Sequence, residues 1–292
     1  MKCIRPALVP DPLISVVMPS YNRAGVISRA LDSILAQTLT RFEVIIVDDG
    51  STDDTLALLD GFGDPRIALF QSDRNRGAPA ARNAGVEKAR TPLIAFQDSD
   101  DEWLPGLLAA HVHALKRYDV SFCQLDQRYG DQRTLYPRPG WALGPDLYAQ
   151  LLETSHISTQ TLALTKALFH RVGGFDPDMP RFQDWDLVLR LAQSGARFRY
   201  TDQPLAIAHD SADSLTRNVE KGIIGRRRIL EKHAAGFAAH PEALAHHRYV
   251  IGSQLRSLGR HGEARDEFAA VLNRKRFSVR AVAQWALAAV GR

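Results

Sequence analysis

Three carboxylates that could bind a metal ion stand close together in the middle of the chain. Asp98, Asp100 and Asp101 follow an apolar run at residues 93–96, whose length is typical of a buried parallel strand. Clustered carboxylates repel one another and raise one another's pKa, so a bound cation stabilises them. Hard oxygen ligands suit Mg²⁺ or Mn²⁺, whose remaining positions are usually filled by phosphate oxygens and water. The alternative is a solvated loop whose acids cap the next helix.

A second pair of acids, Asp48 and Asp49, follows another apolar run at residues 42–47. The order of strand, acidic turn and helix puts both at the carboxyl end of a strand, where open α/β sheets bind ligands. Further along, Asn75 precedes an expected helix and Arg82 lies within it. Arginine and backbone N–H groups near a helix start can hold a phosphate or carboxylate, although an exposed arginine is more often only solvated.

The elements that must position these residues alternate between strands and helices. We predict strands at residues 13–18 (ended by Pro19), 42–47, 66–70 and 93–96, and helices at 24–37 and 78–88. Such alternation indicates an α/β fold with a mostly parallel, doubly wound sheet. The second half is less regular, with strands predicted at 119–124, 159–164, 197–200 and 204–208, a helix at 166–171 and an irregular loop at 129–144.

Four motifs in this order resemble family 2 glycosyltransferases of the GT-A fold. They are VVMPSYN at 16–22, VDDGSTD at 47–53, NRG at 75–77 with ARN at 81–83, and DSDD at 98–101. The resemblance covers residues 13–210. It implies a nucleotide-sugar donor, expected to be a UDP-sugar, a divalent Mn²⁺ or Mg²⁺ held by an Asp-x-Asp motif, and inversion at the anomeric carbon.

The resemblance also assigns roles to the residues of these motifs. Pro19, Ser20 and Tyr21 would shape the pocket of the nucleotide base. Asp49, oriented by Asp48, would accept a hydrogen bond from that base. The remaining expected nucleotide-binding residues are Asn75, Arg82 and Asp98, and the expected metal ligands are Asp98, Asp100 and His209. A single histidine after a strand is more often structural, so the metal role of His209 has that alternative.

A Gly-Gly-Phe-Asp turn at residues 173–176 precedes Gln183 and Asp184. In the family this turn often precedes a Glu-Asp pair whose aspartate is the general base. Gln183 replaces the usual glutamate here, and Asp184 keeps the position of the base. The alternative is that Asp184 and Asp186 are only acids at a helix N-terminus, which the helix dipole favours.

Residues from 214 onward have a helical pattern, and residues 258–272 resemble one helix-turn-helix of a tetratricopeptide array. We therefore divide the chain into a catalytic domain at 1–212, with a nucleotide-binding half at 13–105 and an acceptor-side half at 106–212, and a helical region at 213–292. An amphipathic helix expected at 278–290 begins with basic residues. It could lie on anionic lipid, although packing on its own domain is the commoner fate.

Composition and charge limit the function classes. The chain of 292 residues is 45% hydrophobic and 24% charged, so it is globular, and its two cysteines give no disulfide framework. Residues 1–216 carry 22 Lys and Arg against 27 Asp and Glu, whereas residues 217–292 carry 15 against 6. We find no apolar run of the roughly 20 residues that a membrane span needs. Prolines 6, 10 and 12 interrupt any signal peptide.

The resemblance implies a glycosyltransferase, and the composition predicts a cytoplasmic protein that could lie at the inner face of the membrane. Its expected partners are a nucleotide-sugar donor, a sugar, glycan or lipid-linked acceptor, and the membrane surface through the basic C-terminal helices; we expect no nucleic acid. Two other functions stay open at this stage. One is a nucleotidyltransferase, although residues 19–22 are not a glycine-rich phosphate loop. The other is a non-catalytic protein that binds a nucleotide sugar.

Overall fold

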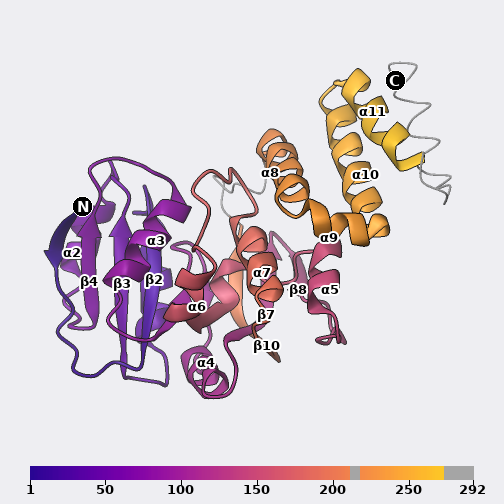
Figure 1. Cartoon of the computed structure of the whole chain (residues 1–292). Helices are drawn as coiled ribbons and strands as arrows, with labels where there is room; N and C mark the ends of the chain where they lie inside the picture. The colour runs from indigo at the N-terminus through magenta and orange to yellow at the C-terminus, as the bar shows by residue number, and fades with distance from the viewer. Residues whose placement is uncertain (211–217, 273–292) are drawn as a thin grey trace. The chain divides into compact units, whose positions relative to one another are not determined.

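The computed structural model of the chain describes residues 1–210 and 218–272 (Figure 1). The chain divides into two compact units. The first, here called the sheet unit, contains residues 1–145, 156–178 and 183–212. The second, the helical unit, contains residues 146–155 and 179–182 together with the chain from 213 onward. The helix predicted at 278–290 lies outside the described residues.

The sheet unit is built on one mixed sheet of ten strands in the order β1-β4-β3-β2-β5-β9-β7-β10-β6, with β8 paired to β7. The strands are β1 (Lys2–Arg5), β2 (Ile14–Ser20), β3 (Phe42–Asp48), β4 (Ile67–Gln71), β5 (Leu93–Phe96), β6 (Glu102–Trp103), β7 (Val120–Tyr129), β8 (Gln132–Tyr136), β9 (Leu162–Thr165) and β10 (Phe198–His209). The neighbouring strands β4, β3, β2 and β5 are parallel. The predicted α/β fold with a mostly parallel sheet is confirmed.

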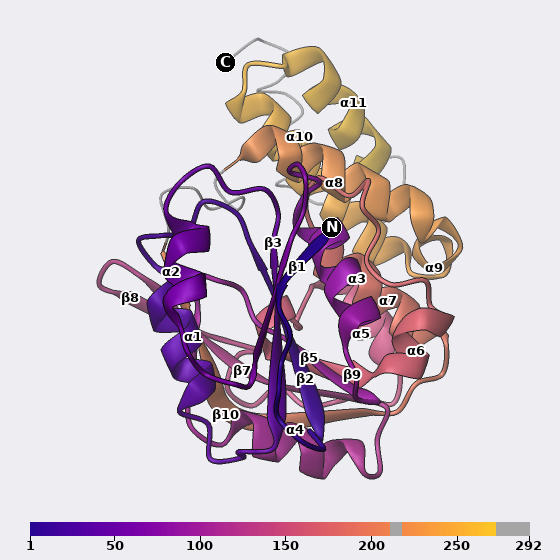
Figure 2. The same cartoon turned by 90° about the vertical axis from the view of Figure 1, so that its left-hand side faces the viewer.

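Helices cover both faces of the sheet. They are α1 (Ile27–Leu35), α2 (Thr55–Gly61), α3 (Ala78–Lys88), α4 (Leu107–Leu115), α6 (Lys166–Arg171) and α7 (Gln183–Gln193). In Figure 2, α1 and α2 lie on one side of β2 and β3, and α3, α6 and α7 lie on the other. Strands β2 and β3 are buried along their whole length because both of their faces are covered. This apolar core holds the carboxyl ends of the strands in place.

Several predicted boundaries were wrong. The loop expected at 129–144 contains β8, which pairs with β7 as a hairpin, and the strands expected at 197–200 and 204–208 form one strand with irregular register around Pro204. Residues 159–161 form a 3₁₀ turn rather than the start of a strand. Pro19 lies inside β2 rather than ending it. Beyond Val17 that strand pairs only with β3, so no ladder to β5 requires the missing N–H group.

The helical unit consists of α5 (Leu147–Glu153), α8 (Val219–Lys232), α9 (Ala234–Ala239), α10 (Pro241–Ser257) and α11 (His261–Leu272). Helices α8, α10 and α11 share a small core of Ile223, Ile251, Leu255, Ala264 and Phe268. The helix-turn-helix expected at 258–272 is instead formed by α10 and α11, with the turn at 258–260. In the described part of the chain no helix is long and apolar enough to cross a membrane.

Candidate functional site

The carboxyl ends of three neighbouring strands bring the predicted residues to one edge of the sheet. Ser20, the last residue of β2, lies opposite Asp48, the last residue of β3. On the other side of β2, Phe96 of β5 lies opposite Val17, and Asp98 follows two residues later. The parallel order therefore places the serine and both acidic turns next to one another, as the sequence pattern predicts.

Asp49 binds the turn that contains Asn75. Its Oδ2 accepts hydrogen bonds from the backbone N–H groups of Arg76, at 2.9 Å, and Gly77, at 2.7 Å. Asn75 Oδ1 also accepts from the Gly77 N–H, at 2.9 Å. Burial raises the pKa of the Asp49 carboxyl, although these two backbone donors oppose the shift. One carboxylate thus fixes the turn that links β4 to α3.

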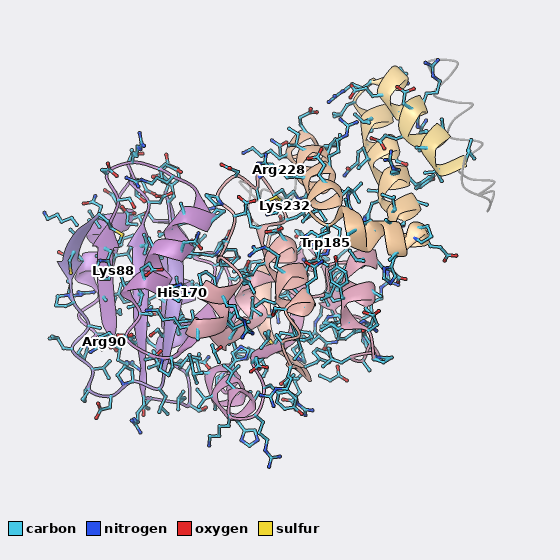
Figure 3. All side chains as sticks on the ribbon, viewed as in Figure 1. Lys88, Arg90, His170, Trp185, Arg228 and Lys232 are labelled. Carbon is cyan, nitrogen blue, oxygen red and sulfur yellow. The ribbon has the colours of Figure 1, made fainter. Side chains whose placement is uncertain are left out.

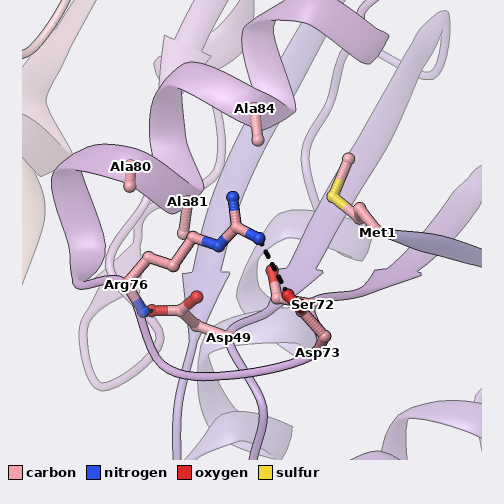
Figure 4. A pocket seen from close by; sticks show the side chains of 8 residues that line it. All are labelled: Met1, Asp49, Ser72, Asp73, Arg76, Ala80, Ala81 and Ala84. Carbon is pink, nitrogen blue, oxygen red and sulfur yellow. Dashed lines mark hydrogen bonds and ion pairs between the residues drawn. The ribbon is translucent and has the colours of Figure 1, made fainter.

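A hollow opens beside this turn, and Figure 4 shows the side chains that line it. Asp49, Ser72 and Asp73 lie on one side of the hollow, and Arg76 and three alanines of α3 complete it together with Met1. Its volume is about 120 Å³. Small-molecule sites usually have volumes of about 300–1,000 Å³, so this hollow accommodates a part of such a ligand. The exposed ring of Tyr21 lies in the turn after β2 at the same edge of the sheet.

Several buried polar atoms at this edge have no hydrogen-bond partner among the described residues. They are Ser20 Oγ, Asp48 Oδ1, both amide atoms of Gln97, and Arg82 Nε. Ser20 is 2% exposed, and Asp48 and Gln97 are fully buried. Because buried polar atoms are normally hydrogen-bonded, a group of such atoms at a ligand-binding edge indicates that a ligand or ordered water completes them. Gln97 is not among the residues predicted from the sequence, although a polar residue that ends an apolar strand was a visible signal.

Arg82 and Asp98 form a partly buried ion pair. Arg82 Nη2 lies 2.5 Å from Asp98 Oδ1, and the arginine is only 6% exposed. The Arg82 guanidinium also lies over the ring of Phe175, with its Cζ atom 5.3 Å from the ring centroid. Arg82 is therefore not a solvated surface residue. It keeps a positive charge beside the carboxylates that follow β5.

The carboxylates after β5 are crowded. Burial, and then the charges of Asp98 and Asp100, raise the pKa of Asp101 well above that of an ordinary aspartate. Asp101 accepts a hydrogen bond from the backbone N–H of His209, at 3.1 Å. The His209 ring is directed to another acid, because its Nε2 lies 3.1 Å from Glu102 Oε2. His209 therefore adjoins the acidic cluster, and its role as a metal ligand stays a prediction.

The donor set at Asp98 and Asp100 suits a small divalent cation. Carboxylate oxygens are hard ligands. Beside them, burial and then the charges of Asp98 and Asp100 raise the pKa of Asp101. Within residues 1–210 and 218–272, no three His, Cys, Asp or Glu side chains are grouped as a complete metal site. The residues thus fit an ion that takes one or two protein carboxylates and completes its shell with phosphate oxygens.

Asp184 lies in the first turn of α7, where its own Oδ1 accepts the backbone N–H of Trp185 at 2.8 Å. The residue as a whole is partly exposed. Burial raises the pKa of its carboxyl; the charge of Arg82 opposes that shift and the charge of Asp98 adds to it. These electrostatic interactions indicate that Asp184 lies near the Arg82–Asp98 pair, whose aspartate is 86 residues earlier in the chain. A carboxylate with a raised pKa can act as a general base.

Comparison with known proteins identifies a sequence family and similar folds. Residues 15–173 match the sequence model of glycosyl transferase family 2. A relative from Escherichia coli, the UDP-Glc:alpha-D-GlcNAc-diphosphoundecaprenol beta-1,3-glucosyltransferase WfaP, is 27% identical over 84% of this chain and 95% of its own length.

Two solved structures have a similar fold. One is residues 1–349 of TarS from S. aureus in complex with UDP-GlcNAc, with a TM-score of 0.60, 18% identity, and coverage of 96% of this chain and 88% of that one. The other is the mannosyltransferase PcManGT from Pyrobaculum calidifontis in complex with GDP-Man and Mn2+. It gives a TM-score of 0.65 and 21% identity over 98% of this chain and 81% of that one.

Proposed function

The chain belongs to family 2 of the glycosyltransferases and has the GT-A fold, and we propose that it moves a sugar from a UDP-sugar to a hydroxyl of a lipid-linked glycan with inversion. Family membership makes the protein a glycosyltransferase. It excludes the two alternatives, a nucleotidyltransferase and a non-catalytic protein that binds a nucleotide sugar. The donor, the acceptor and the stereochemistry belong to the proposal.

The observation that carries the proposal is the convergence of unsatisfied polar atoms and opposite charges at one edge of the sheet. Ser20 Oγ, Asp48 Oδ1 and Arg82 Nε are buried there without hydrogen-bond partners in residues 1–210 and 218–272. Beside them, Arg82 and Asp98 form an ion pair whose charges both act on Asp184. A nucleoside diphosphate sugar supplies hydrogen-bonding groups for the strand ends and an anionic diphosphate for the arginine. It also brings an anomeric carbon that must lie near a base.

In the proposed reaction Asp184 accepts the proton of the acceptor hydroxyl while that oxygen attacks the anomeric carbon. The bond from that carbon to the diphosphate breaks on the opposite face, and its electron pair leaves with the nucleoside diphosphate. One displacement of this kind inverts the configuration. General-base assistance typically contributes about 10²–10⁴-fold in rate.

Asp98 and Asp100 would hold the divalent ion, Mn²⁺ or Mg²⁺. When bound, the ion supplies positive charge that stabilises the leaving diphosphate, so that no protein group has to protonate it. Arg82 orients Asp98 through their 2.5 Å contact. Asp49 holds the Asn75–Gly77 turn closed beside the hollow in which we expect part of the nucleotide to bind.

The acceptor part of the proposal follows from the relatives. WfaP is described as acting on a diphosphoundecaprenol-linked sugar, and an acceptor of that class would bring this enzyme to the cytoplasmic surface of the membrane. On α8 the residues Lys221, Ile224, Arg228 and Lys232 recur at spacings of three and four, which places them on one helix face (Figure 3 labels Arg228 and Lys232). Ile224 is 47% exposed. Basic residues around an exposed apolar one suit anionic lipid.

Melting temperatures measured with added nucleotide and metal test the donor and the metal together. We expect UDP to raise the melting temperature of the wild-type chain more with Mn²⁺ than with a chelator, because a ligand that binds only the folded state stabilises it. Asp100→Ala should lose this metal-dependent increment and the transfer activity while remaining folded. Full transfer by the wild-type chain in the presence of chelator would contradict the metal assignment, and a larger shift with GDP than with UDP would contradict the choice of base.

Product analysis and vesicle binding test the other parts. We expect the new glycosidic bond to have the anomeric configuration opposite to that of the donor, read by NMR of the product. We also expect binding to vesicles that contain anionic lipid, weakened by salt and by the Lys221→Glu, Arg228→Glu double variant. Arg265→Glu on α11 is the control for the same kind of charge reversal outside this face of α8. Equal losses from both variants would show a non-specific charge effect.

A further inference from the structure

The Gly-Gly turn, defined here as residues 172–175, is bound from two sides by side chains that the proposed reaction does not use. From α3, Asn83 makes two hydrogen bonds to the backbone of Phe175. Its Nδ2 donates to the Phe175 carbonyl, at 2.7 Å, and its Oδ1 accepts from the Phe175 N–H, at 2.9 Å. The two residues are 92 positions apart in the sequence. Asn83 thus satisfies both polar backbone groups of a buried residue.

Phe175 in turn contacts the residues that carry the charges of the site. Its ring lies against the Arg82 guanidinium and packs edge-on against Phe96, with ring centroids 5.1 Å apart. Phe96 is the last residue of β5, two positions before Asp98. The residue that Asn83 holds is therefore packed against both the arginine of the Arg82–Asp98 pair and the strand that leads to its aspartate.

From the other side, α7 binds the same turn through Arg190. Its guanidinium donates to the carbonyl of Gly174, at 2.7 Å, and also to the carbonyl of Val172. Two further contacts, at 2.7 and 3.0 Å, join it to Asp186 Oδ2. Asp186 is fully buried and lies two residues after Asp184 in the first turn of α7. Arg190 thus connects the start of the helix that carries Asp184 to the Gly-Gly turn.

The turn leaves no room for another residue at position 174. Gly174 has a φ of +67°, and a Cβ atom there would lie 2.9 Å from both Asn83 Oδ1 and a ring carbon of Phe169. The backbone conformation and the close approach both require glycine. Asn83, the turn and Arg190 therefore form one closely packed connection between α3 and α7.

We propose that Asn83 and Arg190 are positioning residues that act through the Gly-Gly turn to fix the Asp184 carboxylate relative to the Arg82–Asp98 pair. The inference rests on the proposed function, in which Asp184 is the base and the pair lies beside the donor diphosphate. Neither residue contacts the substrate in this scheme. A displacement of about 1 Å in a reacting group can cost about 10²-fold in rate, so a fixed connection between the two parts of the site matters for turnover.

A double-mutant cycle tests the connection. We expect Asn83→Ala to lower kcat by about 10- to 100-fold while the donor KM and the affinity for UDP with Mn²⁺ change less than about threefold, because the lost interaction acts on the base rather than on the donor. Asp184→Asn should be slow by itself. The variant that carries both changes should be no slower than Asp184→Asn alone. Once the base has been removed, the loss of the residue that positions it has no further effect on the rate.

A matched control separates positioning from general loosening of the fold. Lys166 Nζ donates to the carbonyl of Ala89, at 2.9 Å, and so joins the start of α6 to the end of α3 by a similar contact outside the turn. Lys166→Met should leave kcat within about threefold of the wild type. Arg190→Lys, alone and combined with Asp184→Asn, repeats the double-mutant cycle from the other side of the turn. A lysine keeps the charge beside Asp186, but one ammonium lacks the planar fork that spans both carbonyls.

The outcomes distinguish this inference from the proposed function. Transfer at the wild-type rate by Asp184→Asn would contradict the proposed base. A slow Asp184→Asn whose loss multiplies with that of Asn83→Ala would overturn the positioning role alone. The positioning role would also be wrong if Asn83→Ala raised the donor KM in proportion to its loss in kcat, or if Lys166→Met were equally slow. If neither Asn83→Ala nor Arg190→Lys folds, the connection is part of the structural core and the inference is wrong.

Discussion

Replacing Asp184 with asparagine should change the rate and the stability in opposite directions. Asparagine keeps the side-chain oxygen that accepts the Trp185 N–H, but its amide cannot take the proton of the acceptor hydroxyl. We expect kcat to fall by about 10²–10⁴-fold, the usual contribution of a general base, which corresponds to about 2.7–5.5 kcal/mol in the activation free energy. Donor and metal binding should persist almost unchanged.

The stability of the same variant follows from the direction of the pKa shift. Burial raises the pKa of Asp184 above the value of an unfolded aspartate. At neutral pH its charge is therefore less favourable in the folded chain than in the unfolded chain, and a neutral asparagine removes that cost. The melting temperature should stay the same or rise. A residue that only stabilises the start of α7 would give the opposite result, a loss of about 1 kcal/mol with normal turnover.

The assay measures transfer, UDP binding and thermal melting on one preparation, and repeats the transfer across pH. The wild-type rate should fall as the pH decreases through the raised pKa of Asp184, because the protonated carboxyl cannot accept another proton. This limb should lie at higher pH than that of an ordinary aspartate and should be absent in Asp184→Asn. Transfer at the wild-type rate by the variant, or an unchanged acid limb, would refute the reasoning.

Three further predictions concern binding and stability. Asp49→Ala should raise the donor KM by about 10- to 100-fold with a smaller change in kcat, because it releases the turn beside the hollow; a loss confined to kcat would contradict this. Gly252→Ala should lower the free energy of unfolding, measured in urea, by about 1–3 kcal/mol, since its Cβ would lie 2.7 Å from a Phe268 ring carbon. Gly262→Ala is the control: its Cβ would meet open space, so the free energy of unfolding should rise by up to about 1 kcal/mol. The pKa of His247 is lowered to about 3, mainly by burial. The contribution of neutral His247 to the free energy of unfolding should therefore be complete above pH about 6.5. Below that pH the free energy of unfolding should decline by up to about 1.4 kcal/mol per pH unit, and His247→Gln should make this decline less steep.

The sequence was sufficient for the sheet that holds the site but not for all of its strands. The apolar runs at β2, β3 and β5 are short, continuous and bounded by polar turns, so their type and order could be predicted. Strand β8 could not, because its residues are mostly exposed and acquire strand structure by pairing with β7. Likewise, β6 is only two residues long and exists through its pairing with β10.

The same distinction applies to the site. Asp48, Asp49 and Asp98 could be placed because each lies at, or within two residues of, the carboxyl end of a strand. The function of Asn83 was hidden, since its partner is 92 residues away and the contact is to backbone. Gln97 was overlooked because a polar residue beside acids is typical of a loop, whereas the fold buries it completely. A long-range contact such as that of Asn83 has no local sequence pattern.

The arrangement of the sheet unit explains how it tolerates so many unfavourable groups at one edge. Buried atoms without partners, such as those of Gln97, and a crowded acid such as Asp101 each oppose folding. They are concentrated at the carboxyl ends of strands whose remaining length is buried on both faces. We therefore expect the apolar core behind the edge to supply stability that the edge itself lacks. A ligand that satisfies these atoms should therefore stabilise the fold, and the melting temperature in the presence of UDP and Mn²⁺ tests whether they are such ligands.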